Sequence, residues 1–235
     1  MNTPVGVLSK QPRGANPLLI HWLGRTPYAE GLAVQEAQVR ARQLDRGPDA
    51  LFLMEHPPVI TLGRGANPGH VLLDAHEAAA HGIEVRETGR GGDVTFHGPG
   101  QLVGYPVLAL RGKKRDAHRY LRDLEEAMIL ASASFGVRAR RCRGLTGVWV
   151  GNRKLAAIGV RISTGWITSH GFALNVTTDL SSFDAIVPCG IRGMGVTSLA
   201  EVTGLRYSLE EVVGVVSARV AQVLDLHPVV LPGPE

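Results

Sequence analysis

A glycine-rich run and two short segments that follow it contain the residue types most capable of chemistry in this chain. The run extends from Arg90 to Tyr105, and six of its sixteen residues are glycine or proline. Because glycine loses much backbone entropy on folding, such density is typical of tight turns or of main chain that a ligand approaches closely. Asn152–Gly159 adds a lysine and Ile186–Gly190 adds a cysteine. The three segments together predict a small-molecule site with an amine and a thiol beside it.

Lys154 is the candidate amine. Four of the 25 basic residues are lysines, and the other three lie near the N-terminus or in a basic cluster beside Arg115. An arginine keeps its proton at any working pH, whereas a lysine can lose it. A lysine retained next to Arg153 therefore indicates a position that needs a titratable amine, although codon bias would produce the same scarcity without any chemistry.

Cys189 is the stronger of two candidate thiols. It lies between Pro188 and Gly190, before further glycines, and a loop of this kind gives a nucleophile the open surroundings that it needs. Cys142 has arginines on both sides, and cationic neighbours lower the pKa of a thiol. The alternation over residues 137–143 predicts a strand, however, in which Cys142 faces the core as a small apolar residue. Two cysteines are too few for a disulfide framework.

Two of the nine histidines, His97 and His170, neighbour glycines and are candidates to donate hydrogen bonds in a site. Surface or loop positions are expected for six others: His21, His70, His76, His81, His118 and His227. The chain has no Cys-x-x-Cys or His-Glu-x-x-His motif, so we expect no zinc site. Gly98–Gly104 misses the dinucleotide fingerprint by one residue and lacks a phosphate-loop ending. A Cys–His hydrolase stays open, because its partners need only meet in space.

Bulk properties describe an ordinary globular protein with a basic charge balance. The 235 residues carry a formal net charge of +4, which favours acidic partners. Aromatic residues make up only 5%, and no helix-turn-helix or RNA-recognition pattern occurs, so a nucleic-acid-binding module is the weaker interpretation. No apolar run approaches the roughly 20 residues of a membrane span. The N-terminus lacks the apolar region of a secretory signal, and we expect a cytoplasmic protein.

The pattern of elements predicts one α+β domain over residues 18–227, with a disordered tail over 1–17 and a loose tail over 228–235. Asp74 and Ser208 are predicted N-caps, and Ser198–Glu201 and Ser208–Glu211 both read as capping boxes. Because helices alternate with strands and at least one hairpin occurs, we expect a mixed sheet covered by helices. Helices are expected over 30–46, 74–81, 116–135 and 208–226, strands over 50–54, 59–62, 83–88 and 166–176, and a hairpin over 148–162.

Three of these segments, in this order, resemble the lipoyl (octanoyl) transferase family. They are Arg90–Leu102, Lys154–Gly159, and Pro188–Gly190 followed by Thr197-Ser198. Further matches are His56–Pro58, Thr61–Gly63 and His170–Val176, and the resemblance covers roughly residues 20–226. The departures are small: Asp93, Phe96 and Phe172 stand where the family often has Gln, Tyr and Leu, which bears on pocket shape.

The resemblance implies a biotin/lipoate ligase-transferase-like catalytic fold with a mixed, mostly antiparallel sheet. It implies an acyltransferase that moves octanoyl or lipoyl from acyl carrier protein to a lysine of an apo lipoyl domain. It also implies that Cys189 carries the acyl thioester and that Lys154 lowers the pKa of the Cys189 thiol. The residues implied to bind substrate are Arg90, Gly91, Gly92, Asp93, Val94, Thr95, Phe96, His97, Ala157, Ile158, Gly159, Gly171, Phe172 and Ala173.

The resemblance also implies the partners. The acyl group arrives on the phosphopantetheine of the carrier protein, without a metal or a further cofactor. The acceptors are apo lipoyl domains of 2-oxoacid dehydrogenase and glycine cleavage proteins. The basic cluster of Lys113, Lys114 and Arg115 suits acidic protein partners of this kind. Elementary chemistry agrees, because a nearby ammonium stabilises the thiolate that attacks a thioester, and the same amine can later serve as a base.

Three alternatives remain at this point. An ATP-dependent lipoate or biotin ligase on the same fold would hold an adenylate with the glycine-rich loop and would not need Cys189. A basic module without catalysis would bind nucleic acid with a steep salt dependence. A thioesterase would pass the acyl group to water instead of an amine.

Overall fold

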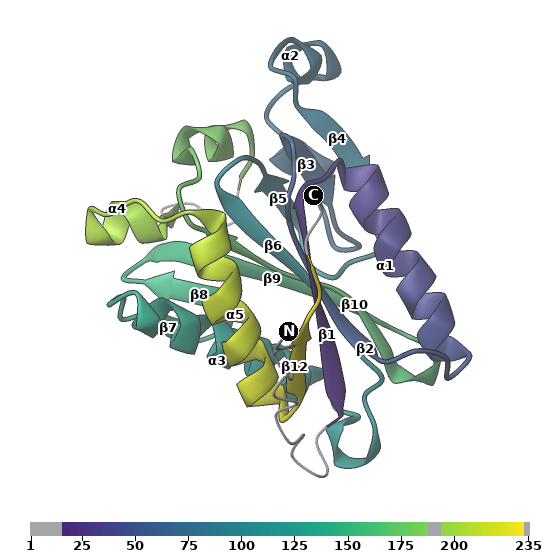
Figure 1. Ribbon diagram of the computed structural model, residues 1–235. Helices are drawn as coiled ribbons and strands as arrows, with labels where there is room; N and C mark the ends of the chain where they lie inside the picture. The colour runs from purple at the N-terminus through teal and green to yellow at the C-terminus, as the bar shows by residue number, and fades with distance from the viewer. Residues whose placement is uncertain (1–15, 188–193, 233–235) are drawn as a thin grey trace, which may run out of the picture.

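A mixed nine-stranded sheet is the centre of the fold (Figure 1), which a computed structural model describes for residues 16–187 and 194–232. Its strand order is β12-β1-β2-β6-β10-β9-β8-β7, with β11 paired to β9. Most neighbours are antiparallel, whereas β1 runs parallel to both β2 and β12. The strands are β1 (Pro17–Arg25), β2 (Asp49–Glu55), β6 (Gln101–Val107), β7 (Arg140–Cys142), β8 (Leu145–Val150), β9 (Arg153–Ser163), β10 (Ile167–Asn175), β11 (Gly195–Val196) and β12 (His227–Val230).

A smaller sheet of β3 (Val59–Leu62), β4 (Glu84–Glu87) and β5 (Val94–His97) is joined to the large one through the glycine-rich run. The amide of Gly91 donates to the carbonyl of Val160 on β9 at 2.9 Å, and the amide of Gly65 donates to Gly92 at 3.1 Å. A Cβ added at Gly63 would lie 2.3 Å from the Gly92 oxygen, and one at Gly159 would lie 2.9 Å from the Gly91 oxygen. Only glycine permits these backbones to approach so closely.

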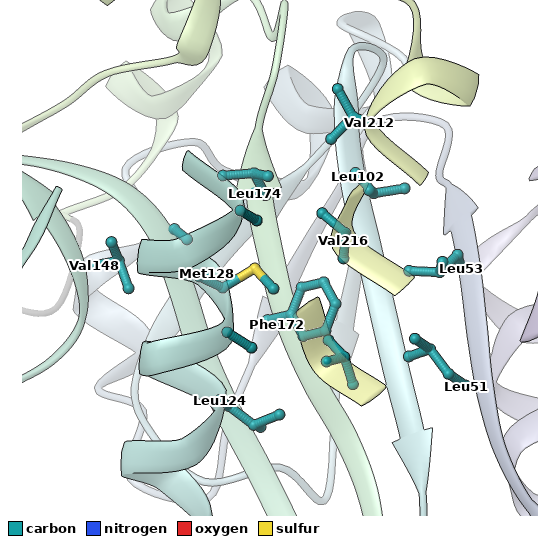
Figure 2. Packing of buried hydrophobic residues seen from close by; sticks show 14 of the residues in the cluster. Leu51, Leu53, Leu102, Leu124, Met128, Val148, Phe172, Leu174, Val212 and Val216 are labelled. Atoms are coloured by element: carbon teal, nitrogen blue, oxygen red, sulfur yellow. The ribbon is translucent and has the colours of Figure 1, made fainter. Parts of the chain in front are cut away.

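Helices cover the large sheet on both faces. The helices are α1 (Tyr28–Gln43), α2 (Ala75–Ala80), α3 (Ala117–Ser134), α4 (Leu199–Thr203) and α5 (Leu209–Leu224), with 3₁₀ turns at Pro68–His70, Gly112–Lys114, Thr164–Trp166 and Leu180–Ala185. α3 and α5 pack together on one face, whereas α1 lies on the other face against β10, β6 and β2. Figure 2 shows the main core, where strand residues such as Leu102 and Leu174 meet Met128 of α3 and Val216 of α5.

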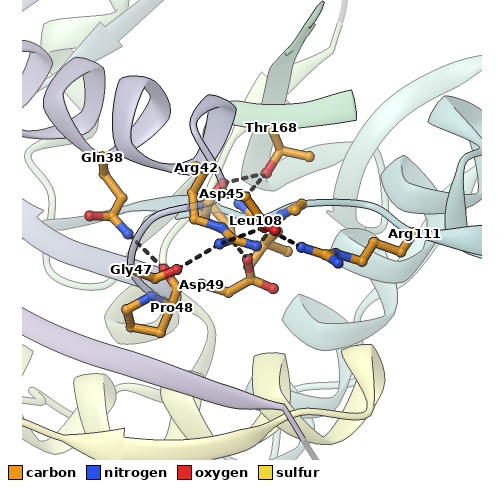
Figure 3. Close-up of polar contacts among 11 residues, drawn as sticks. Gln38, Arg42, Asp45, Gly47, Pro48, Asp49, Leu108, Arg111 and Thr168 are labelled. Carbon is orange, nitrogen blue, oxygen red and sulfur yellow. Dashed lines mark hydrogen bonds and ion pairs between the residues drawn. The ribbon is translucent and has the colours of Figure 1, made fainter. Parts of the chain in front are cut away.

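A buried polar network ties the end of α1 to the sheet at the margin far from the glycine-rich run (Figure 3). Arg42 donates to the Asp49 carboxylate at 3.0 Å and to the carbonyl of Gly47 at 2.6 Å. The same carboxylate accepts from the amide of Ala109 at 2.9 Å. Burial raises the pKa of Asp49, while its hydrogen bonds and Arg42 oppose that rise. The network therefore satisfies a charge pair that burial alone would disfavour.

Most predicted elements are confirmed within about two residues at each end. Asp74 and Ser208 each form a full capping box, and the hairpin turns at Gly151, whose φ is 60°. Only one of the two hydrogen bonds of the capping box expected at Ser198 is present, so that prediction was wrong in part. Ser198 accepts from the amide of Glu201, but the Glu201 carboxylate bonds Thr197 and Arg153 instead of the cap.

The predicted tails need two corrections. Residues 228–230, expected in a loose tail, belong to β12, because β1 offers an unpaired edge that a short apolar segment can satisfy. Pro17, expected in the N-terminal tail, already begins β1. Residues 1–15 lie outside the described part, so disorder there stays a prediction. None of the helices within residues 16–187 and 194–232 has the length and apolar composition that crossing a membrane requires.

Glu125 of α3 is a fully buried carboxylate that fastens the β7–β8 hairpin to the helix. It accepts from the amide of Gly147 at 3.1 Å, from Arg122 at 2.6 Å and from Arg141 at 3.0 Å. Two of these bonds, from Gly147 and Arg141, join the hairpin to α3 through a single buried acid, and the third comes from α3 itself.

We predict that Glu125→Ala lowers the free energy of unfolding by about 2–3 kcal/mol, because the buried amide of Gly147 loses its acceptor and two arginines lose theirs. Urea unfolding at neutral pH measures the change. Glu126→Ala is the matched control: that neighbouring carboxylate is 41% exposed and bonds Arg141. Its effect should stay below about 1 kcal/mol. Equal losses in the two variants would contradict the role given to Glu125.

Candidate active site

A cavity of about 300 Å³ lies between the glycine-rich run and the large sheet. This is the lower end of the range for small-molecule sites, about 300–1,000 Å³. Among the described residues, its lining includes thirteen of those that the resemblance implies for catalysis or substrate binding: Arg90, Gly92, Asp93, Val94, Thr95, His97, Lys154, Ala157, Ile158, Gly159, Gly171, Phe172 and Ala173. Twelve further residues line it: Tyr28, Gln101, Val103, Tyr105, Gly144, Leu145, Thr146, Trp149, His170, Asn175, Phe183 and Val196.

Small residues make the floor of the cavity. Ala157 stands opposite Ala173, and Gly159 stands opposite Gly171, in the antiparallel pair β9–β10. Because paired residues lie on one face of a sheet, these four positions leave an open strip where larger side chains would fill the space. The strip is apolar and continues along β9 towards Lys154, which suits an extended acyl chain.

Lys154 enters the cavity because β9 carries a bulge. Val148 pairs with Ala156, but the next residue of β8, Trp149, pairs with Lys154, so Leu155 is the extra residue. Without this bulge, alternation would put Lys154 on the same face as Ala156, in the helix-covered core. The Lys154 side chain is instead 7% exposed, and its Nζ lies 4.8 Å from the centre of the Trp149 ring. That is the distance of a cation–π contact.

Gly147 covers the other side of the lysine chain. Its φ is 120°, and a Cβ there would lie 3.4 Å from Lys154 Cε and 2.7 Å from the Ala156 oxygen. The Glu125 carboxylate holds the Gly147 amide in place. A buried acid on α3 therefore fixes the backbone that packs against the candidate catalytic amine.

Cys189 lies outside the described residues, and its pairing with Lys154 stays a prediction. The segments on either side of it are described. Val187 donates its amide to the carbonyl of His70 at 2.8 Å. On the other side, Val196 pairs with Lys154 in the parallel β11–β9 contact and lines the cavity. The strand that follows the cysteine-bearing segment is thus bonded to the strand that carries the lysine.

A cluster of rings closes one part of the cavity: Tyr28, His56, His97, Tyr105 and His170, all buried. His56 donates from Nδ1 to the Thr26 carbonyl at 2.7 Å, so its Nε2 accepts from the Tyr105 hydroxyl at 2.9 Å. The carbonyl partner fixes this tautomer, because a carbonyl oxygen can only accept.

A second chain of bonds fixes the tautomer of His97. The Gln101 amide nitrogen donates to Phe96 O at 3.1 Å and to Asn175 Oδ1 at 2.9 Å, so Gln101 Oε1 accepts from His97 Nδ1 at 2.7 Å. Asn175 in turn donates to the carbonyl of Thr197 at 3.0 Å. His97 thus donates a hydrogen bond within the cavity wall, and its Nε2 is left as an acceptor.

Burial keeps these histidines neutral. Desolvation lowers the pKa of His97 to about 3, with His56 and Arg90 adding to the effect. Desolvation also lowers the pKa of His170 to about 4, again with help from Arg90. His170 adopts a left-handed backbone, φ 55°, and its amide bonds the buried Gln35. At neutral pH this part of the cavity thus offers neutral imidazoles.

The other implied binding residues take varied positions. Arg90 is 8% exposed and donates to the carbonyl and hydroxyl of Thr61 at 2.6 and 2.9 Å. Asp93 accepts from His70 Nδ1 at 2.6 Å, so His70 is tied to the cavity wall and not simply a surface residue.

Two expected substrate contacts lie elsewhere. The Phe96 ring packs on Phe183 in the core of the small sheet, 5.6 Å between centres, and Phe96 is not a lining residue. Gly91 also lies behind the lining, bonded to Val160. Phe172 lines the cavity, but its ring packs in the main core over Gly104 (Figure 2). Alternation along the strand turns the Phe96 ring away from the cavity, which a motif does not reveal.

The positions of Cys142 and His21 bear on two further expectations. Cys142 is half-buried on β7 and is absent from the lining. His21, expected at the surface, lies in β1 and stacks on Phe52, with ring centres 4.8 Å apart. Within residues 16–187 and 194–232, no group of three or more metal-ligating side chains gathers.

The sequence motifs did not identify some of the residues that line the cavity. Trp149 sits in an apolar alternating stretch and reads as an ordinary core residue until its register opposite Lys154 is known. Tyr28 lies far upstream at the start of α1 and carried no signal. Gln101 and Asn175 did lie inside matched segments, and an amide directly after the Gly98–Gly100 turn is the signal that could have marked Gln101.

We predict that the protein loses stability as pH falls below about 6.5, the ordinary histidine pKa, towards about 3–4, where His97 and His170 take up protons in the folded state. In that window the unfolded chain binds protons that the folded chain does not. His97→Gln should flatten the decline of the urea midpoint between about pH 7 and pH 5, because one buried neutral histidine is gone. His76→Gln, at an exposed position, should leave the slope unchanged, and identical slopes in all three proteins would refute the prediction.

Comparison with known proteins agrees with this geometry. Residues 27–221 match the lipoyl protein ligase A/B catalytic domain family. An octanoyltransferase of Rubrobacter xylanophilus is 57% identical over 182 residues, 77% of this chain and 81% of that protein. An octanoyltransferase of Solibacter usitatus is 50% identical over 211 residues, 90% of this chain and 94% of that protein.

The fold is also found in a solved structure. A bipartite lipoate protein ligase from Thermoplasma acidophilum, studied with its E2 lipoyl domain, superposes with a TM-score of 0.71 at 17% identity, covering 93% of this chain and 88% of that one. At this identity the likeness concerns the fold, and it confirms the predicted α+β, lipoate-ligase-like architecture. With its close relatives the chain belongs to the lipoyl protein ligase A/B catalytic domain family, and it is an acyltransferase of the octanoyltransferase group.

Proposed function

We propose that the enzyme takes an octanoyl or lipoyl group from the phosphopantetheine of acyl carrier protein and passes it to a lysine of an apo lipoyl domain through a thioester on Cys189. Transfer of octanoyl or lipoyl groups follows from the octanoyltransferase relatives and the family. The observation that carries the mechanism is the buried Lys154, aimed into an apolar-floored cavity and bonded through β9 to the strand that follows Cys189.

In the first half-reaction, the Lys154 ammonium favours the Cys189 thiolate. An ammonium within about 4–6 Å lowers the pKa of a thiol by about 1–3 units. The thiolate attacks the acyl carbonyl, a new carbon–sulfur bond forms, and the bond to the pantetheine sulfur breaks. Lys154 gives its proton to the departing thiolate and becomes a neutral amine. The acyl chain lies on the strip formed by Ala157, Gly159, Gly171 and Ala173.

In the second half-reaction, the neutral Lys154 acts as the base. The acceptor lysine attacks the thioester carbonyl, a carbon–nitrogen bond forms, and Cys189 leaves as a thiolate. Lys154 takes the proton that the acceptor nitrogen loses, so the ammonium–thiolate pair is restored. No ATP is consumed, because the donor thioester is already activated, and the cycle requires no metal or further cofactor.

The acceptors in this proposal are apo lipoyl domains of 2-oxoacid dehydrogenase and glycine cleavage proteins, and the reaction takes place in the cytoplasm. The solved T. acidophilum ligase, studied with its E2 lipoyl domain, supports an acceptor of this type. Lys114 and Arg115 of the basic cluster that is expected to meet the partners are not among the residues that line the cavity. Lys114 donates to the carbonyl of Leu224 at the end of α5, so part of the cluster serves as a helix cap.

Cys189→Ala should abolish transfer while the protein stays folded. Incubation of the wild-type enzyme with octanoyl carrier protein, without ATP, should add the mass of one octanoyl group, removable by hydroxylamine. The added mass should be missing from the Cys189→Ala variant. Cys142→Ser is the matched control and should keep nearly full activity, because Cys142 is not part of the cavity lining. Acylation that needs ATP, or full activity without Cys189, would overturn the proposal.

Lys154→Arg should separate the two half-reactions. An arginine keeps a positive charge beside the thiol but cannot act as a base. Acyl-enzyme formation should therefore persist, whereas transfer to the acceptor amine should slow by about 10²-fold. Rapid-quench mass analysis of each half-reaction measures this. Wild-type rates in both steps would show that Lys154 is not the base.

A further inference from the structure

A row of paired residues leads from Lys154 to the edge of the large sheet. Trp149 on β8 pairs with Lys154, and Arg140 on β7 pairs with Trp149. Directly paired residues share a face of the sheet, so Arg140 lies on the same face as the lysine. Two strand spacings separate the Cα atoms of Arg140 and Lys154 by about 10 Å. β7 is the last strand in the order, and Arg140 is exposed there.

The charge of Arg140 is not compensated by a carboxylate of the described residues, whereas that of Arg141 is. Arg141 alternates to the other face, where it bonds Glu125 and Glu126 on α3. Arg140 donates to a carbonyl, that of Gly151, at 3.3 Å, and it forms no ion pair with any residue of the described ranges.

Arg143 adds a second charge beside the cavity. It is exposed in the turn between β7 and β8, directly before Gly144 and Leu145, which line the cavity. Among the described residues it too has no acidic partner. By contrast, Arg153 on the neighbouring β9 is paired with Glu201. Two exposed arginines thus border β8: Arg140 beside Trp149, two strand spacings from Lys154, and Arg143 at the turn before Leu145.

The donor of the proposed reaction brings an anion to this place. Its reactive thioester is attached to pantetheine, a flexible arm that ends in a phosphate. When the acyl carbonyl lies at Lys154, the arm must leave the cavity towards solvent, and its phosphate carries negative charge. Guanidinium groups match phosphate oxygens with parallel hydrogen bonds and keep their charge at any working pH.

We propose that Arg140 and Arg143 form a subsite for the phosphate of the donor's phosphopantetheine arm. This inference rests on the proposed function. It assigns recognition of the donor to the edge strand β7, about two strands away from the reacting atoms, and it separates donor recognition from the acyl-binding floor on β9 and β10.

The test compares octanoyl-4′-phosphopantetheine with octanoyl-pantetheine, which differ only in the phosphate. The measurement is kcat/KM for transfer to an apo lipoyl domain. The wild-type enzyme should prefer the phosphorylated donor by about tenfold, the value expected for a charge-assisted hydrogen bond. The double variant Arg140→Gln with Arg143→Gln should bring the ratio close to one, with the loss confined to the phosphorylated donor and to octanoyl carrier protein.

Arg46→Gln is the matched control, because Arg46 is exposed beyond the end of α1, far from β7. It should keep the wild-type ratio. A wild-type ratio near one, an unchanged ratio in the double variant, or an equal fall with both donors would each overturn the subsite. Failure of the wild-type enzyme to use either donor or octanoyl carrier protein would instead refute the proposed function.

Discussion

The position of the Lys154 amine depends on one extra residue in β9. Strand pairing would otherwise alternate this lysine into the core between the sheet and α3, where a charge could not be tolerated. The bulge at Leu155 moves the amine to the opposite face, against the ring of Trp149 and the backbone of Gly147. α3 supports the arrangement through Glu125, whose carboxylate holds the Gly147 amide. Glu125, Gly147 and Trp149 therefore together fix the position of the Lys154 amine.

The same cavity shows how burial controls charge. Its floor is apolar and made of small residues, so it can accept a flexible chain, while its ring cluster is polar but neutral. The histidines stay uncharged because desolvation outweighs their hydrogen bonds, and the nearby Arg90 makes their protonation still less favourable. The chain from His97 through Gln101 and Asn175 to Thr197 reaches the strand bonded to Lys154. Ring orientation and the geometry of β11 are thus held by one set of bonds.

The sequence predicted local structure correctly wherever residues a few positions apart decide it. Caps at Asp74 and Ser208 and the hairpin that turns at Gly151 were predicted from residues a few positions apart. Expectations failed where a distant partner competes: Glu201 bonds Arg153 and Thr197 instead of completing a box, and residues 228–230 pair with β1 instead of forming a tail. In the site, the motifs located the glycine-rich wall and Lys154, yet they also included Phe96 and Gly91, which lie behind the cavity lining.

The sequence by itself determined that a lysine-bearing strand and a glycine-rich run belong to one chemical site, since residue type and chain order carry that information. It determined the capped helices for the same reason, because their signals are local. Tertiary structure alone decided which side chains face the cavity. That choice depends on register: the bulge that turns Lys154 into the cavity, the pairing that places Trp149 and Arg140 in its row, and the close approach of Gly63 to Gly92 and of Gly159 to Gly91. Register is set by contacts between strands far apart in the chain, and no single segment encodes it.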